Sequence, residues 1–307
     1  MTTKTFGTLG LMLGPAAVLY LAGYSEAAHY LALGSVLALQ LSLLARRVAA
    51  FSILLPAVYA AAAITAQSTD GVVALIVAIA AAVGAASSQG LHRGLIALLA
   101  AALLGSFEPA AGTTVLQRSG FLLAGSCHGF VLSITVLRGV ALEGRPVNAQ
   151  AALGYAALVA VLALLAWFAA RFAGFPHGWW LPLAVTAVCE PIQSGPTRNA
   201  LLRVAAALCA TLLLVSVVDG FNTPWVRAVL LVATLTLALA VARRQDWMLA
   251  VLLTPVLVLL SSHGALHEPP LGYLVSALPA FLPVLAVAGL GQWLFWILRS
   301  DPGRAVA

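Results

Sequence analysis

The residue types best suited to binding chemistry lie in one short interruption of the apolar chain, at residues 189–203. This stretch contains one carboxylate, Glu190, two arginines, Arg198 and Arg203, and several helix-breaking Pro and Gly residues. Within a bilayer, backbone that leaves a helix must be satisfied by protein or by water, and ionisable groups are costly enough to mark a substrate or ion path. An arginine stays charged and binds a carboxylate through two parallel hydrogen bonds. The interruption therefore predicts a site for an organic anion.

Structural roles remain open for the same charged residues. Arg198 and Arg203 lie roughly 140° apart on a helix, so one can face a pathway while the other reaches lipid headgroups. The alternative is that both are anchors at the membrane surface. Glu190 is predicted to couple proton movement or to gate, because desolvation disfavours the charged form of a carboxyl group. Its alternative role is a salt bridge to either arginine.

Neutral and aromatic side chains complete the predicted substrate site. Gln193 and Ser194 would supply neutral hydrogen bonds to the anion. Trp179 and Trp180 precede the interruption and would offer a stacking surface to an aromatic substrate. The alternative for both Trp residues is an anchor at the membrane–water interface, where Trp is enriched. We expect no metal and no cofactor.

Composition places these residues in an all-α polytopic membrane protein. Hydrophobic residues make up 63% of the 307 residues and charged residues 8%, with a mean hydropathy of +1.06, whereas soluble domains have about 25% charged residues. The net charge is +6, but the basic residues are scattered in ones and twos, which argues against a nucleic-acid partner. The expected partners are the lipid bilayer and a small organic anion.

A spanning helix needs about 20 apolar residues, and cutting the chain at charges, Pro, Gly and polar clusters predicts about 12 spans. We expect the protein to lie in the inner membrane with both termini in the cytoplasm. This orientation places all but three of the 15 basic residues on the cytoplasmic side, as the positive-inside rule requires. The exceptions are Arg118, Arg171 and Arg227. The predicted spans are residues 6–23, 27–45, 48–67, 71–88, 91–107, 119–137, 151–173, 178–190, 199–218, 224–242, 246–262 and 272–298.

Arginines occur at equivalent positions relative to the predicted spans in the two halves of the chain. Arg46 precedes the third span as Arg198 precedes the ninth, and Arg93 precedes the fifth as Arg244 precedes the eleventh. This predicts two tandem six-helix repeats of the same orientation, an arrangement found in some transporters. The first repeat is residues 1–140, followed by a cytoplasmic linker at 141–150, a second repeat at 151–298 and a short tail at 299–307.

Catalytic motifs are missing from the sequence, so we expect no enzyme. There is no nucleophile elbow, no zinc-protease His-Glu-x-x-His and no phosphate-binding loop. Residues 125–129 read Gly-Ser-Cys-His-Gly and look reactive but match none of these motifs. We expect Cys127 to be a buried thiol and His128 a hydrogen-bonded core residue, with a proton relay as the alternative for His128.

Several motifs of the second half carry a resemblance to a known family. In order, they are Gly178-Trp179-Trp180-Leu181-Pro182, Glu190-Pro191, Thr197-Arg198, Asp246-Trp247 and Thr254-Pro255. This order resembles the fusaric-acid-resistance (FUSC) superfamily, which includes aromatic-acid exporters and, more distantly, aluminium-activated malate transporters. The resemblance covers roughly residues 150–298. It implies six-helix units paired around an anion pathway, with the short arginine-bearing connection near that pathway.

Taken with the residues, the resemblance favours an inner-membrane transporter of organic anions such as aromatic carboxylates, working as a proton-coupled exporter. One alternative is a passive organic-anion channel. Another is a membrane scaffold subunit of an efflux assembly, which would bind a periplasmic adaptor protein. An unrecognised intramembrane lipid-modifying enzyme is the last alternative.

Overall fold

The fold of this chain comes from a computed structural model that describes residues 3–44, 46–107, 112–136, 146–172, 174, 178–179, 182–183 and 186. These residues form helices and their connections, with no strand among them, so the all-α prediction is confirmed for this part of the protein. The helices are α1 Thr3–Leu21, α2 Ser25–Leu44, the 3-10 helix η1 Arg46–Leu54, α3 Leu55–Thr65, α4 Thr69–Ser87, α5 His92–Phe107, α6 Thr113–Thr135 and α7 Ala149–Phe172.

Six of the first seven spans predicted from hydropathy each overlap one described α-helix, with ends that differ by up to six residues, and the third is divided. Among the described helices, α4 and α7 are long and apolar enough to cross a membrane. The predicted count of 12 spans and the tandem duplication involve residues that lie outside the described part of the chain. They therefore stay predictions.

The third predicted span differs from the structure at Pro56. Instead of one helix over residues 48–67, the chain forms η1 and then α3, in which Pro56 lies in the first turn. Proline has no N–H to donate to the carbonyl four residues earlier, and its ring disfavours α geometry in the residue before it. Proline is favoured in the first turn of an α-helix, where its missing N–H has no intrahelical partner, and α3 accordingly begins at Leu55.

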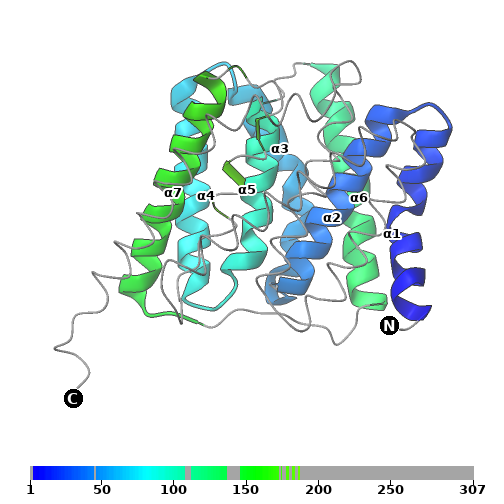
Figure 1. Cartoon of the computed structure of the whole chain (residues 1–307), viewed down its shortest axis with the longest axis horizontal. Helices are drawn as coiled ribbons and strands as arrows, with labels where there is room; N and C mark the ends of the chain where they lie inside the picture. The colour runs from blue at the N-terminus through cyan, green and yellow to red at the C-terminus, as the bar shows by residue number, and fades with distance from the viewer. Residues whose placement is uncertain are drawn as a thin grey trace, which may run out of the picture.

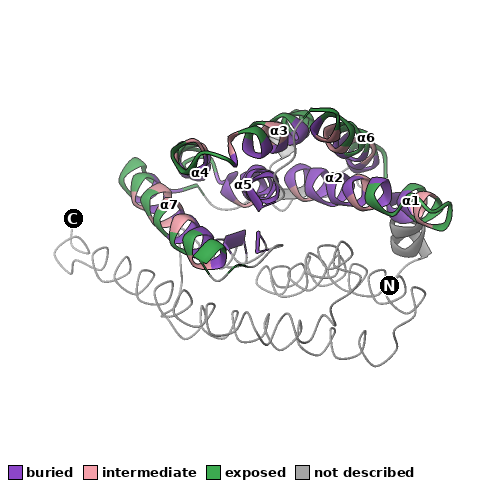
Figure 2. Cartoon of the chain, turned by 90° about the horizontal axis from the view of Figure 1, so that it is seen from above, coloured by how far each residue is buried: buried purple, intermediate pink, exposed green. Residues whose placement is uncertain are grey.

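The described helices pack in two rows (Figures 1 and 2). Helices α7, α5 and α2 pack against α4, α3 and α6 respectively, and α1 packs on α2 at the end of the arrangement. Helix α5 is the central element: every residue from Gly94 to Phe107 is buried. A helix that is apolar and buried on all sides belongs to the interior of a helical assembly.

Glycine residues let α2 and α6 lie in close contact. A Cβ added at Gly34 would collide with the Leu122 carbonyl oxygen, and one added at Gly125 would collide with the Leu31 carbonyl oxygen. The Ser35 hydroxyl donates to the Gly125 carbonyl over 3.1 Å. Small residues and hydroxyl groups of this kind are typical of helix contacts in membranes.

The sequence Gly125-Ser126-Cys127-His128-Gly129 therefore has a packing role. Gly129, like Gly125, faces the backbone of α2, where its added Cβ would collide with the Ser35 carbonyl oxygen. Cys127 is exposed, so the expectation of a buried thiol is wrong: this face of α6 points away from the other described helices.

His128 compensates for a proline inside α1. Pro15 lies within this helix and has no N–H for the Leu11 carbonyl four residues earlier. The His128 Nε2 lies 2.8 Å from the Leu11 carbonyl oxygen. Since a carbonyl only accepts, Nε2 carries the proton and donates. The prediction that His128 is hydrogen-bonded is confirmed, and the bond connects α6 to α1. His128 is only partly buried, so the prediction of a core position is wrong.

Candidate functional site

The described part of the chain includes one residue of the predicted substrate site. This residue is Trp179. The other six predicted site residues lie outside the described residues, and their roles stay predictions: Trp180, Glu190, Gln193, Ser194, Arg198 and Arg203.

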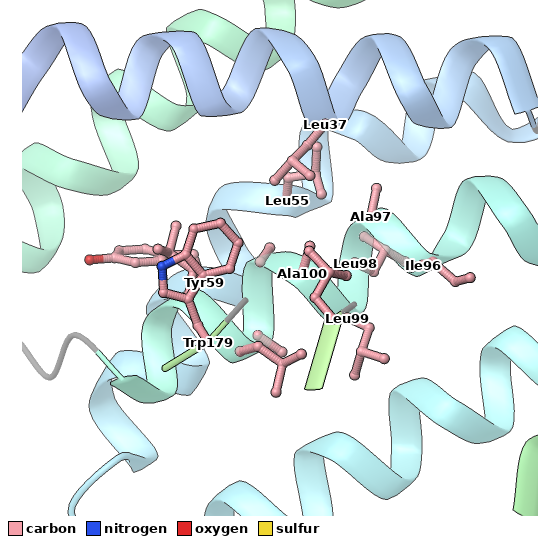
Figure 3. Close-up of a cluster of buried hydrophobic side chains, with 14 of the residues drawn as sticks. Leu37, Leu55, Tyr59, Ile96, Ala97, Leu98, Leu99, Ala100 and Trp179 are labelled. Atoms are coloured by element: carbon pink, nitrogen blue, oxygen red, sulfur yellow. The ribbon is translucent and has the colours of Figure 1, made fainter. Parts of the chain in front are cut away.

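Trp179 lies in the protein core. Its side chain is 1% exposed, and it belongs to the same buried cluster as Tyr59 and Leu99. Figure 3 shows the Trp179 indole nitrogen and the Tyr59 hydroxyl directed to the same side of this cluster. The Trp179 Nε1 has no hydrogen-bond partner among the described residues. An anchor in the headgroup region needs an exposed ring, so this burial argues against the anchor alternative for Trp179, and both alternatives stay predictions.

A polar cluster that sequence reasoning did not assemble lies among the helices of the first half. We call Glu26 and Tyr30 of α2, Tyr59 of α3 and Arg118 of α6 the Arg118 cluster. The Arg118 Nε donates to Glu26 Oε1 over 2.6 Å. The Arg118 Cζ lies 5.4 Å from the centre of the Tyr30 ring, within the range of a cation–π contact.

The two tyrosines form the buried wall of the cluster. Tyr30 is 2% exposed and Tyr59 is fully buried. Their rings meet edge to face with centroids 5.6 Å apart, and the Tyr59 hydroxyl donates to the Tyr30 hydroxyl over 3.5 Å. The Tyr59 side chain also hydrogen-bonds with Arg118. The positive charge of Arg118 therefore lies against two fixed aromatic groups.

Helix geometry explains why these residues meet. Glu26 and Tyr30 are four residues apart on α2, so they share one face of the helix. Helices α2 and α6 run parallel, because Leu31 faces Gly125 and Ser35 faces Gly129. The same register places Arg118 beside Glu26. Glu26 is in the first turn of α2, where the helix dipole favours a negative charge.

The cluster lies a short distance inside the helix ends. Tyr30 and Arg118 each lie five residues after the first residue of their helices, and Tyr59 lies six residues before the end of α3. At a rise of about 1.5 Å per residue, this places them roughly 7–9 Å within the helices. By the topology prediction, these ends face outward.

One sequence signal for the cluster was available. Hydropathy predicts Arg118 in an outer connection, but α6 begins at Thr113 and includes it. Arg118 and Arg171 both contradict the positive-inside rule, and each lies over an aromatic ring: Arg171 Cζ is 5.3 Å from the centre of the Trp167 ring. An arginine that the topology places outside, against the positive-inside rule, was thus the signal for a contact with an aromatic ring.

The helices that the structure describes form no candidate metal site. No three His, Cys, Asp or Glu side chains come together there in a group that could hold a metal ion. What the Arg118 cluster offers is a positive charge that is partly buried and reachable, which suits the binding of an anion.

The fold defines a helical, membrane-like protein, and comparison of the sequence with known families makes this more specific. Residues 164–290 match the family described as fusaric acid resistance protein-like. The resemblance predicted from the motifs is thus confirmed over this segment. No significant match was found among curated proteins or solved structures. The family is associated with membranes and points to transport or efflux.

Proposed function

We propose that this protein is an inner-membrane transporter of organic anions, such as aromatic carboxylates, and that it works as a proton-coupled exporter. The observation that carries the proposal is the family match over residues 164–290, because this segment contains all seven predicted site residues. Two observations support organic anions as the substrate class. The matching family is named for resistance to an organic acid, and two arginines lie close together in an otherwise apolar segment.

In the proposed mechanism, the charged interruption binds the anion and the apolar helices around it exclude water. Arg198 and Arg203 attract the carboxylate, because a guanidinium offers it paired N–H donors. Gln193 and Ser194 donate neutral hydrogen bonds. Trp179 is already buried, which supports a role close to the substrate, since its indole nitrogen has no partner among the described residues.

Glu190 couples transport to protons in this mechanism. An ionised carboxylate close to Arg198 or Arg203 competes with the substrate for the guanidinium groups. When Glu190 binds a proton, it releases the arginines, and the substrate anion takes its place. Proton and anion binding are thereby linked.

Flux measured in proteoliposomes tests the proposal. Benzoate and aliphatic carboxylates are loaded, and either a pH gradient or a voltage is imposed. We expect saturable flux driven by the pH gradient, with loss of the gradient dependence in Glu190→Gln and at least about tenfold lower flux in Arg198→Gln or Arg203→Gln, roughly the effect of losing one charge-assisted hydrogen bond. Arg243→Gln, predicted to lie in a cytoplasmic connection, is the matched control.

The same measurement separates the alternatives. Flux that follows voltage and ignores both pH and Glu190 would identify a passive anion channel. Flux that requires an added periplasmic adaptor would identify a scaffold subunit of an efflux assembly. Normal flux in both arginine variants would overturn the assignment of the site.

A further inference from the structure

We propose that Arg118 is a second carboxylate-binding site, located in the first half of the chain, and that Glu26 is its built-in, exchangeable occupant. A small organic carboxylate binds there by displacing the Glu26 side chain from the Arg118 guanidinium. This site lies outside the segment that matches the family. The inference rests on the proposed function only for the choice of organic carboxylates as probes.

The cation of this site is held in place. The Arg118 side chain is 23% exposed, which makes it reachable from outside while most of its surface is covered. The Tyr30 ring lies 5.4 Å from the Arg118 Cζ, and the Tyr59 side chain hydrogen-bonds with Arg118. Because both tyrosines are buried, they fix the guanidinium without neutralising its charge.

The carboxylate of this site, by contrast, is loosely held. The Glu26 side chain is 61% exposed. Among the described residues, the Glu26 contact to Arg118 is a single bond, from Nε to Oε1. A guanidinium has five N–H donors, and its strongest carboxylate complexes use two in parallel. An exposed ion pair with one bond contributes little, so a free carboxylate that binds two donors can replace Glu26.

Carboxylate chemistry follows from the group that is replaced. The resident partner of Arg118 is itself a monocarboxylate, and the planar guanidinium fork fits a carboxylate better than a spherical ion such as chloride. A partly buried cation also needs an anion beside it, because an unpaired charge out of water is unfavourable. When Glu26 leaves, a ligand must take over its charge.

The test is binding of benzoate and acetate to the purified full-length protein by calorimetry, at constant ionic strength with chloride as the reference anion. It is carried out in the wild type and in an Arg198→Gln/Arg203→Gln background, where the predicted second-half site is disabled. Because Glu26→Gln removes the competing carboxylate and keeps the side-chain shape, we expect it to lower the Kd for benzoate. The decrease is roughly two- to sixfold, because a weak, exposed ion pair leaves Arg118 free of Glu26 for roughly one-sixth to two-fifths of the time.

Variants at Arg118 complete the test. Arg118→Gln should abolish benzoate binding in the double-variant background, and Arg118→Lys, which keeps the charge but loses the fork, should weaken it. Arg171→Gln is the matched control, because Arg171 also lies over an aromatic ring, and it should bind like its parent. If Arg118→Gln does not fold, Glu26→Gln alone decides the question.

An unchanged or higher Kd in Glu26→Gln would overturn the proposal, and so would benzoate binding that persists in folded Arg118→Gln. Either result would make the Arg118 cluster a structural ion pair. The proposed transport function fails in a different way. In that case no carboxylate flux occurs in proteoliposomes, while benzoate binding in the double-variant background still depends on Arg118 and Glu26.

Discussion

At the scale of single residues, three polar groups of the described helices are explained by the partner that each one satisfies. Arg118 has a carboxylate and a tyrosine ring, and the Trp167 Nε1 donates to the Ser106 hydroxyl over 3.0 Å. His128 supplies the donor that Pro15 lacks. In a low-dielectric interior, a polar group without a partner is costly, so each of these contacts fixes the position of a helix.

The pair of His128 and Pro15 gives a prediction at this scale. His128→Leu should lower the free energy of unfolding by about 1 kcal/mol, because the Leu11 carbonyl, which Pro15 leaves without a donor in α1, loses its partner on α6. In a Pro15→Ala background, the new alanine supplies the missing N–H within α1, so the same His128→Leu change should cost clearly less. Unfolding by detergent titration in mixed micelles measures both differences. Equal costs in the two backgrounds would show that His128 stabilises the protein by packing alone.

At the scale of the elements, small residues determine which helices are neighbours. Gly34 and Gly125 bring α2 and α6 into backbone contact, and Gly105 brings α5 against the Tyr59 carbonyl of α3. Gly84 does the same between α4 and α7, facing Ala156. Since apolar side chains gain little by leaving lipid for protein, close packing and hydrogen bonds drive helix association in a membrane.

Two glycines of α6 provide a matched test of this packing. Gly125→Ala should destabilise the protein by about 1–3 kcal/mol, because the new methyl group collides with the rigid backbone of α2. At Gly120 nothing lies within 4 Å of an added Cβ, so Gly120→Ala should be neutral or stabilising by up to about 1 kcal/mol through helix propensity. Detergent-induced unfolding measures both. Similar effects at both positions would contradict the contact at Gly125.

At the scale of the whole molecule, the two predicted repeats are in contact within the described residues. Helix α7 begins the second predicted repeat, and it packs against α4 of the first. Trp179 and Leu183 join the buried cluster that includes α3 and α5. The first residues of the second half therefore contribute to the core of the first half.

Topology gives the prediction at this scale. With both termini in the cytoplasm, a phosphatase that is active only outside the inner membrane should be active when fused after residue 110 and inactive when fused after residue 307. The reason is the excess of basic residues in the connections predicted to be inside. Fusion after residue 90, in a connection predicted to be cytoplasmic, is the control for position. Phosphatase activity after residue 307 would place the C-terminus outside the inner membrane and contradict the predicted topology.

The sequence by itself was sufficient for the helical class, the approximate positions of six of the first seven predicted helices and the family resemblance. Each of these depends on local signals: apolar runs of spanning length, their breaks at charges and prolines, and short motifs in a fixed order. The division of the third span was missed, although Pro56 signals it, because hydropathy does not register the loss of a backbone donor.

Tertiary structure alone decided the contacts between helices. Glu26 and Arg118 are 92 residues apart, and they meet because α2 and α6 run parallel in a register fixed by their glycines. Hydropathy contains no information about which helices become neighbours. It also does not show which face of a helix turns inward, so Trp179 and Cys127 required the structure: one is buried in the core and the other is exposed. The physical reason is that shape complementarity between helix surfaces, unlike an apolar run, is a property of two segments together.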